Sequence, residues 1–168
     1  MNIKERFIIR YAPDAIKVGM ACDFRPDILL AQAALETGWG QHVVANNLFG
    51  IKDLPWNEGN VQAITKEHDG SHLIEIVARF EDFKTPLESM IAYIALIRTA
   101  PRYRKAWHNR HDPICYFHAL QDAGYATDPF YANKCIAVWK SLPKNWLEIA
   151  ARARIRGEMK REGERHEG

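Results

Sequence analysis

Hydrophobic positions along the chain predict a mostly helical protein. The nearly continuous apolar run from Ile28 to Leu35 follows Arg25-Pro26-Asp27 and predicts a helix that is buried on most sides. Further helix starts are marked where a capping side chain precedes a proline, because proline fits the first helical position. These starts are Thr85-Pro86, with a helix through Ile97, Asp112-Pro113, with a helix that ends at Gly124, and Asp128-Pro129, with a helix that ends before Pro143.

One segment has the period of β-structure instead. Between residues 59 and 80, the stretches VQAIT and HLIEIVARF are rich in β-branched residues and flank Asp69-Gly70, a dipeptide that favours a tight type I′ hairpin turn. After Trp146 the sequence is rich in Ala, Arg and Glu, which predicts a solvated helix that frays into a disordered tail. We therefore expect an α+β, predominantly helical fold, with one domain over residues 1–147 and a charged helix or tail over residues 148–168.

Composition and charge narrow the class of protein. The chain has 168 residues, 47% of them hydrophobic, with five Trp, six Tyr and seven Phe, which is typical of a well-packed globular protein. Lys and Arg total 23 against 21 Asp and Glu, a net charge of +2. The stretch from Arg98 to His111 is a local positive patch on this neutral background, so we expect no nucleic-acid partner.

Cysteines, histidines and apolar runs exclude several other classes. Cys22, Cys115 and Cys135 form no CxxC pair and lie in apolar stretches, so we expect buried reduced thiols. The histidines form no HExxH motif, and we predict neither a metal nor a cofactor. The longest apolar run, Met90 to Ile97, is far shorter than the roughly 20 residues of a membrane span. The N-terminus lacks the pattern of a secretory signal, which predicts synthesis in the cytoplasm and no membrane insertion.

The segment from Gln32 to Gly40 is the strongest candidate for chemistry. Glu36 ends the hydrophobic helix and is followed by two glycines around Trp39. A carboxyl in an apolar, aromatic-lined pocket has a raised pKa and can donate a proton near neutral pH. Trp39 offers a stacking face for a sugar ring. The alternative interpretation is a solvated surface glutamate at a helix end. The GxGxxG, P-loop and GxSxG motifs are absent, which argues against phosphoryl transfer and serine hydrolysis.

Four blocks of sequence resemble the glycoside hydrolase family 73 domain, found in bacterial and phage endo-β-N-acetylglucosaminidases. The similarity extends from about Phe7 to Leu142, in the family's order and spacing. The blocks are AQAALETGWG at residues 31–40, NNLFGIK at 46–52, FEDFKTPLESMIAYIALI at 80–97 and AGYATDPFYANK at 123–134. The resemblance implies a lysozyme-like fold with a small β-hairpin lobe and a groove that binds peptidoglycan glycan strands.

The resemblance also implies roles for individual residues. Glu36 matches the family's catalytic glutamate, the general acid that protonates the glycosidic oxygen. Tyr125 matches a catalytic-site tyrosine that lies near this glutamate and supports positioning of the substrate or its acetamido group. The remaining matches to motif residues are assigned to the substrate groove: Trp39, Asn47, Phe49 and Tyr131.

The second carboxylate is less clearly marked. In the family it lies on the hairpin, and Glu67, just before Asp69-Gly70, matches this place best. The alternatives are Glu75, then Glu81 and Asp82, each interpreted as a solvated charge at a strand end. The 2-acetamido group of the substrate is a further alternative, because it can act as an internal nucleophile in place of a protein carboxylate.

The predicted function is therefore a peptidoglycan hydrolase that cleaves the β-1,4 bond between N-acetylglucosamine and N-acetylmuramic acid. Helper proteins would deliver it to the cell wall, as for a phage lysin or a secreted effector. An N-acetylmuramidase or a lytic transglycosylase of the same fold is the alternative among enzymes, although the GYATDP block argues against both. A noncatalytic wall-binding or virion structural module is the alternative of another class.

Overall fold

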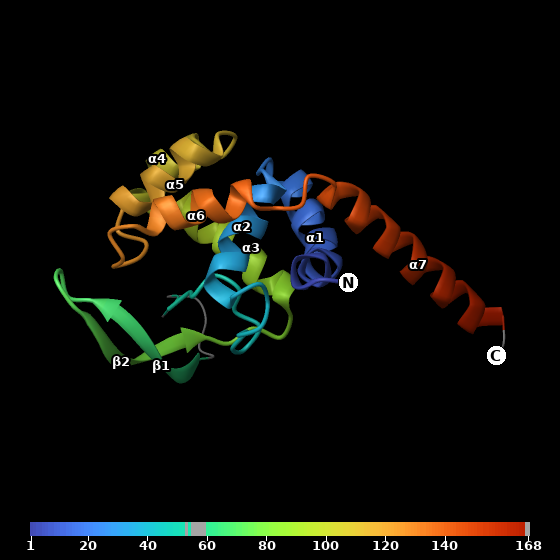
Figure 1. Ribbon diagram of the computed structural model, residues 1–168, viewed down its shortest axis with the longest axis horizontal. Helices are drawn as coiled ribbons and strands as arrows, with labels where there is room; N and C mark the ends of the chain where they lie inside the picture. The colour runs from blue at the N-terminus through green and yellow to red at the C-terminus, as the bar shows by residue number, and fades with distance from the viewer. Residues whose placement is uncertain (53, 55–59, 167–168) are drawn as a thin grey trace.

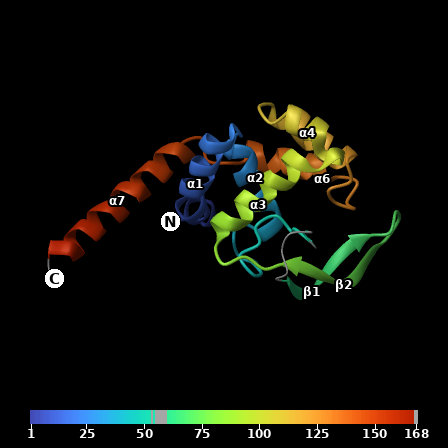
Figure 2. The same ribbon diagram turned by 180° about the vertical axis from the view of Figure 1, so that it is seen from behind.

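The computed structural model describes residues 1–52, 54 and 60–166 as a helical body from which a β-hairpin and a long C-terminal helix extend (Figure 1). The same arrangement is seen from behind in Figure 2. The elements are α1 (Ile3–Cys22), α2 (Pro26–Thr37), β1 (Asn60–His68), β2 (Leu73–Glu81), α3 (Pro86–Thr99), the 3-10 helix η1 (Pro101–Tyr103), α4 (Arg104–His108), α5 (Pro113–Asp122), α6 (Tyr131–Lys140) and α7 (Trp146–His166).

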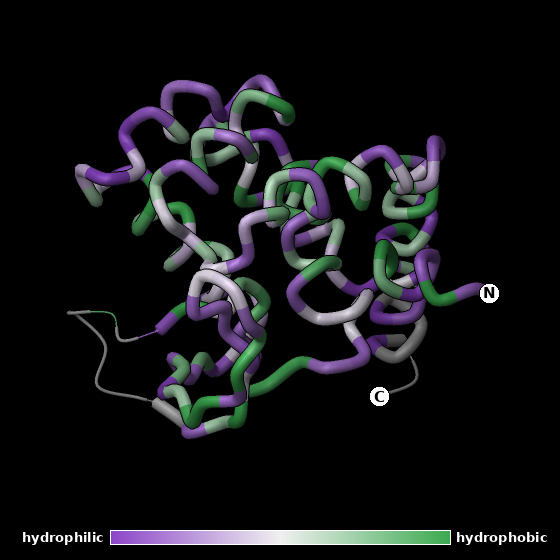
Figure 3. Tube along the Cα trace, turned by 60° about the vertical axis from the view of Figure 1, so that its left-hand side comes forward, coloured by the Kyte–Doolittle hydropathy of each residue, from purple (hydrophilic) through white to green (hydrophobic). Residues whose placement is uncertain are grey.

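Helix α2 lies at the centre of the body, as its apolar sequence predicts. It packs against α1 on one side and α6 on another, and its residues from Ile28 to Ala34 are all buried. Pro26 opens the helix, and Gly38 closes it in the left-handed conformation at φ 55° with its N–H directed to the carbonyl of Ala34. Hydrophobic and hydrophilic residues alternate along the helices of the body (Figure 3), which is typical of helices that bury one face.

Of the three starts predicted from a capping side chain before proline, two are confirmed, and the third helix begins further along the chain. The Thr85 hydroxyl accepts from the Glu88 N–H at 3.2 Å, and the Asp112 carboxylate accepts from the N–H three residues on at 3.1 Å. Asp128 makes a different contact, because it accepts from the N–H of Phe130 at 2.9 Å, and α6 begins only at Tyr131. Asp128 therefore stabilises a turn before the helix, since an Asp side chain binds backbone two residues on in such turns.

The predicted hairpin is present, but its turn differs from the prediction. Strands β1 and β2 pair antiparallel from Asn60 with Glu81 to His68 with Leu73. Residues 69–72 connect them, and the Asp69 carboxylate accepts from the N–H groups two and three residues on, at 3.1 and 2.8 Å. This side-chain turn replaces the two-residue type I′ turn. The base of the hairpin is tied to the loop after α2 by hydrogen bonds from the N–H groups of residues 81 and 83 to the carbonyls of residues 51 and 45.

The two ends of the chain differ from the sequence-based expectation. The patterns above do not predict α1, because Pro13 and scattered charges interrupt the hydrophobic period. Pro13 lies within the helix, and burial of Phe7, Ile8 and Tyr11 stabilises it. Helix α7 extends from Trp146 to His166 and contacts α1, so the expected solvated helix is present and continues through residues expected to form a disordered tail. Within the described ranges, no helix is long and apolar enough to cross a membrane.

The cysteines agree only in part with the prediction of buried thiols. All three, which lie within the described residues, are free. Cys135 is fully buried, Cys22 is partly buried and Cys115 is exposed. The prediction was wrong for Cys115 because α5 places this residue on its solvent face, next to the exposed Ile114, whereas Tyr116 and Phe117 point into the core.

A close contact at Gly19 gives a test of the packing between α1 and α2. A Cβ at this position would lie 2.6 Å from the Phe24 carbonyl oxygen and 3.3 Å from Pro26 Cδ. We expect Gly19→Ala to lower the free energy of unfolding by about 1–3 kcal/mol, because backbone must move to admit the methyl group. Gly157→Ala is the control, since its Cβ meets no described atom within 4 Å and alanine favours a helix. The free energy of unfolding of both variants is measured by chemical denaturation. Equal values for Gly19→Ala and Gly157→Ala would contradict the close contact at Gly19.

Candidate active site

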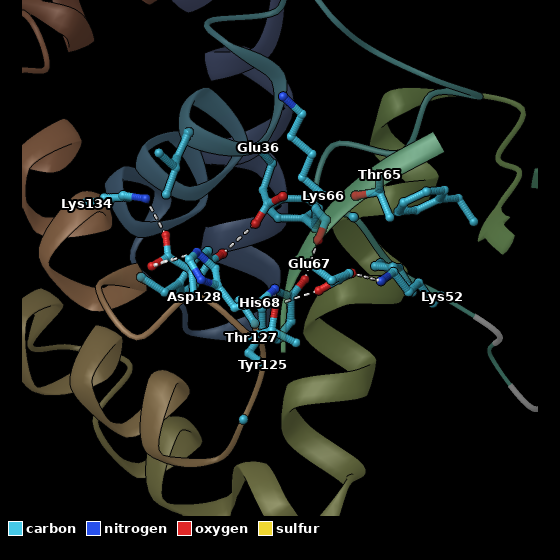
Figure 4. A pocket seen from close by; sticks show the side chains of 18 of the residues that line it. Glu36, Lys52, Thr65, Lys66, Glu67, His68, Tyr125, Thr127, Asp128 and Lys134 are labelled. Atoms are coloured by element: carbon cyan, nitrogen blue, oxygen red, sulfur yellow. Dashed lines mark hydrogen bonds and ion pairs between the residues drawn. The ribbon is translucent and has the colours of Figure 1, made fainter. Parts of the chain in front are cut away.

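A cleft of about 630 Å³ lies between the helical body and the hairpin. Its walls come from the end of α2, the loop at residues 49–52, the end of β1 and the segment between α5 and α6. Figure 4 shows Glu36 from α2 and Glu67 from β1 pointing into this pocket. The fold thus brings together the two carboxylates that the sequence singled out, although they lie on different lobes.

Glu36 is held between a tyrosine and a glycine. The Tyr131 hydroxyl donates to its Oε1 at 2.7 Å. On the other side, a Cβ on Gly50 would lie 3.2 Å from Oε2. Gly50 also has a φ of 63°, in the left-handed region that favours glycine. A residue with a side chain at this position would therefore crowd the carboxyl from the cleft side.

The surroundings of Glu36 disfavour its charge. The side chain is accessible from the cleft, but protein atoms crowd around the carboxyl and limit its hydration. This desolvation raises the pKa of Glu36 to about 7, against the opposing effects of the Tyr131 hydrogen bond and the Lys52 charge, while Glu67 adds to the rise. The raised pKa predicted from the sequence is confirmed. Near neutral pH a large fraction of Glu36 therefore carries a proton.

Glu67 has the opposite character. Its Oε2 accepts from the Thr127 hydroxyl at 2.6 Å, and its Oε1 forms an ion pair with the Lys52 ammonium. Partial burial alone would raise the pKa of Glu67, but the hydrogen bonds from Lys52 and Thr127 outweigh it and hold the pKa below its ordinary value. Glu67 is therefore ionised at neutral pH, where Glu36 is partly protonated. Two carboxyls whose pKa values are driven apart are the arrangement expected of an acid and a base.

The three alternative carboxylates lie outside the described lining of the cleft. Glu75 is exposed on β2, opposite Lys66, and Asp82 is also exposed. Glu81 is buried, with 1% of its surface accessible, and accepts a hydrogen bond from the Leu54 N–H. The interpretation of Glu81 as a solvated charge is therefore wrong, because it binds the backbone of a neighbouring loop.

Tyr125 and Tyr131, the two tyrosines that the resemblance singles out, both line the cleft with Glu36. Tyr131, assigned to the groove, is the residue that contacts Glu36. The hydroxyl of Tyr125 donates to the Phe49 carbonyl, and its ring stacks on that of Tyr131 at 5.9 Å. Phe49 is fully buried and stacks on Tyr93 at 4.3 Å. Tyr125 thus braces the loop that carries Gly50, and the roles of these residues in catalysis or substrate binding stay predictions.

Trp39 and Asn47 are not among the described residues that line the cleft. The Trp39 ring packs against Phe7 of α1 at 5.5 Å and lies under the Lys4 ammonium at 4.8 Å. Asn47 is 7% exposed, and its amide binds backbone groups at Ile51, including the carbonyl at 2.8 Å and the N–H at 3.1 Å. In this structure Trp39 packs on α1 and Asn47 shapes the loop before the cleft, and their contacts with sugar stay predictions.

Three residues at the site were missed by reasoning from the sequence. Lys52 and Thr127 hold Glu67, and Gln32 donates to the Tyr131 hydroxyl at 3.0 Å. Gln32 carried a usable signal, because it is an uncharged polar residue in an apolar helix, one turn before Glu36. Lys52 and Thr127 lie inside matched sequence blocks, but nothing local indicates that they converge on a hairpin carboxylate.

The basic stretch from Arg98 to His111 has a structural use in this fold. The guanidinium groups of Arg98 and Arg110 lie over the Trp107 ring at 5.7 and 4.5 Å. Arg102 donates to the carbonyls of residues 123 and 124 at the edge of the cleft. In the described part of the chain, no group of three or more His, Cys, Asp or Glu residues is placed to hold a metal ion.

Comparison with known proteins gives a consistent result. The family model described as mannosyl-glycoprotein endo-beta-N-acetylglucosaminidase matches residues 12–144. Peptidoglycan hydrolase FlgJ of Vibrio parahaemolyticus is 38% identical over 141 residues, which are 80% of this chain and 46% of that protein. Exo-glucosaminidase LytG of Bacillus subtilis is 34% identical over 123 residues, 67% of this chain and 42% of that protein. The chain therefore spans less than half the length of these two relatives.

Solved structures share the fold over nearly their full length. A mutant peptidoglycan hydrolase from Sphingomonas sp. A1 superposes with a TM-score of 0.77 at 31% identity, over 88% of this chain and 99% of that one. The glycoside hydrolase domain of Salmonella typhimurium FlgJ has a TM-score of 0.65 at 28% identity, over 95% of this chain and 99% of that one. With its lysozyme-like helical body and hairpin lobe, this chain belongs to glycoside hydrolase family 73, the endo-β-N-acetylglucosaminidase family.

Proposed function

We propose that this domain hydrolyses the β-1,4 bond between N-acetylglucosamine and N-acetylmuramic acid in peptidoglycan, with Glu36 as the general acid. The observation that carries the proposal is a pair of carboxyls in one cleft, with the pKa of Glu36 raised to about 7 and that of Glu67 lowered. The relatives named above support the choice of substrate, because their names describe peptidoglycan hydrolases and a glucosaminidase.

Each carboxyl has one task in the proposed reaction. Protonated Glu36 gives its proton to the glycosidic oxygen as the bond from that oxygen to the anomeric carbon breaks. A water molecule attacks the anomeric carbon, and ionised Glu67 takes a proton from it. Lys52 and Thr127 keep Glu67 ionised before the step. Glu36 ends the reaction ionised and Glu67 ends it protonated, so proton exchange with solvent restores both.

Mass spectrometry of digested, purified peptidoglycan tests the bond that is cleaved. Fragments with N-acetylglucosamine at the reducing end are expected. Reducing-end N-acetylmuramic acid would identify a muramidase, and 1,6-anhydro products would identify a lytic transglycosylase. Binding to the wall without release of any fragment would favour a noncatalytic module. Each of these three results would overturn the proposed specificity.

The pH profile of hydrolysis is expected to be bell-shaped. Because the acid must be protonated, activity should fall as pH rises above about 7, the pKa of Glu36. Because the base must be ionised, activity should also fall at acidic pH, where the lowered pKa of Glu67 lies. Initial rates on a soluble glycan fragment across the pH range measure both limbs. Activity that keeps rising between pH 7 and 9, with the protein still folded, would contradict the assignment of Glu36.

The route to the cell wall is a further part of the proposal. A phage lysin and a secreted effector are the two settings that the sequence suggests, and the relatives reported above are bacterial proteins. Neighbouring genes distinguish the settings: a holin gene supports lysis by a phage, and genes for a secretion apparatus support an effector.

A further inference from the structure

A buried polar chain lies behind Glu36. Gln32, one turn earlier on α2, is fully buried, its amide nitrogen donates to the Tyr131 hydroxyl at 3.0 Å, and its amide oxygen accepts from the Tyr93 hydroxyl. Tyr93 also shares a hydrogen bond with the Tyr116 hydroxyl. An amide in an apolar core costs free energy unless its polar atoms are paired. The core therefore holds a polar residue one turn before Glu36, although the neighbouring positions of α2 are Leu and Ala.

With the Gln32 amide in this orientation, the hydrogen bonds from Tyr116 to Glu36 all run in one direction. A tyrosine hydroxyl has a single proton to donate. Because Gln32 donates to the Tyr131 oxygen, the proton of Tyr131 is directed to Glu36 Oε1. The proton of Tyr93 is used on the Gln32 amide oxygen, so Tyr116 is the donor to Tyr93. If the Gln32 amide were reversed, Tyr131 would donate to Gln32 and present only lone pairs to Glu36.

This direction determines which oxygen of Glu36 can carry the acid proton. Oε1 accepts from Tyr131, so the proton of the neutral carboxyl belongs on Oε2. Oε2 is the oxygen beside Gly50, which lines the cleft. We infer that Gln32 is a positioning residue that directs the Tyr131 hydrogen bond to Oε1 and so keeps the transferable proton of Glu36 on the cleft side. The inference rests on the proposed function of Glu36 as the acid.

The other titratable groups around Glu36 do not mask the effect of Gln32 on the pKa of Glu36. Burial raises the pKa values of Tyr125, Tyr131 and Cys135, so these groups stay neutral at neutral pH. Lys52 and Glu67 are the charged groups that act on Glu36, and they are paired with each other. Gln32 itself has no charge and contacts Tyr131, so its removal acts on Glu36 through the Tyr131 hydroxyl.

Substitution of Gln32 by Leu tests the inference. Without the amide, the Tyr131 hydroxyl is no longer held as a donor to Glu36, and the charged form of Glu36 loses stabilisation. We expect the Glu36 titration, followed by NMR on protein with ¹³C-labelled glutamate carboxyls and assigned with Glu36→Gln, to move to higher pH. The alkaline limb of hydrolysis should move in the same direction. The kcat should fall about tenfold with little change in KM, a fraction of the 10²–10⁴-fold contribution of general acid catalysis.

Gln121→Leu is the matched control. Its amide donates to the Pro129 carbonyl at 2.8 Å and accepts from the Ala132 N–H at 2.7 Å, so it also loses two hydrogen bonds at the start of α6. Neither of these two hydrogen bonds involves Gln32, Tyr93, Tyr131 or Glu36. A merely structural role for Gln32 would make the two variants alike, with lower stability and an unchanged Glu36 titration, and would overturn the inference.

Two further variants cover the case in which Gln32→Leu does not fold. Tyr93→Phe keeps the ring stacked on Phe49 but frees the Gln32 amide to reverse, so the titration should again move to higher pH. In a Tyr131→Phe background, adding Tyr93→Phe should change the Glu36 titration no further. A shift that persists in that background would overturn the inference. The titration is measured without substrate, so it does not depend on the proposed reaction. If Gln32→Leu shifts the Glu36 titration but Glu36→Gln stays active, the acid role of Glu36 is rejected and the positioning role of Gln32 is kept.

Discussion

Replacing Glu36 with Gln is expected to lower the rate of peptidoglycan hydrolysis by about 10²–10⁴-fold, the contribution of a positioned general acid. The amide has the size of the carboxyl and can still accept from Tyr131, but it has no acidic proton to give. Turbidity loss of purified cell walls, or release of soluble fragments, measures the effect. Binding of the variant to walls, measured by co-sedimentation, should be retained, because the cleft keeps its shape.

The same variant is expected to gain relative stability as pH rises. The pKa of Glu36 is higher in the folded chain, about 7, than its ordinary value of 4.5. Folded protein therefore binds more protons than unfolded protein between these values, and the stability contributed by Glu36 falls as pH rises through them. Gln has no such dependence. Thermal unfolding should show similar Tm values near pH 4, and a higher Tm for Glu36→Gln at pH 8.

Three results would contradict these expectations, each in a different way. Hydrolysis near the wild-type rate would remove Glu36 from the role of acid. A Tm difference that does not change with pH would mean that the folded environment does not raise the pKa of Glu36. Loss of hydrolysis together with loss of folding at all pH values would show a structural role, because an amide of the same size should pack as the carboxyl does.

Replacing Glu67 with Gln is expected to lower kcat by about 10- to 100-fold, because general base catalysis contributes about 10²–10⁴-fold and water attack persists in part without it. The amide can still accept from Thr127, but it cannot hold a negative charge beside Lys52. The acidic limb of the pH profile, assigned to Glu67, should flatten in this variant. Initial rates on a soluble glycan fragment at several pH values measure both effects.

Glu75→Gln is the control, because it removes a carboxylate from the paired strand outside the described lining of the cleft. If Glu75→Gln lowers kcat and Glu67→Gln does not, the hairpin assignment is wrong. The anomeric form of the first product, followed by NMR, separates the two mechanisms. Inversion is expected when Glu67 activates the water, whereas retention with activity unaffected by Glu67→Gln would assign the nucleophile to the 2-acetamido group of the substrate.

Local signals in the sequence account for much of the fold. Thr85 and Asp112 open helices because a cap acts on N–H groups three residues away, which the chain alone brings into reach. The hairpin follows from the β-branched residues on both sides of Asp69-Gly70. The same kind of signal at Asp128 predicts the helix start too early, because the fold uses this carboxylate in a turn and in an ion pair with Lys134.

The sequence by itself determined the family, the buried central helix and the carboxyl at its end, because each depends on residues close together in the chain. Tertiary structure alone decided which partners reach that carboxyl and its counterpart. Tyr131 contacts Glu36 across 95 positions, and Thr127 contacts Glu67 across 60. It also turned Trp39 toward α1 and away from the cleft. A pKa depends on the protein atoms and charges that surround a group in space, so the difference in pKa between Glu36 and Glu67 exists only once the lobes are folded together.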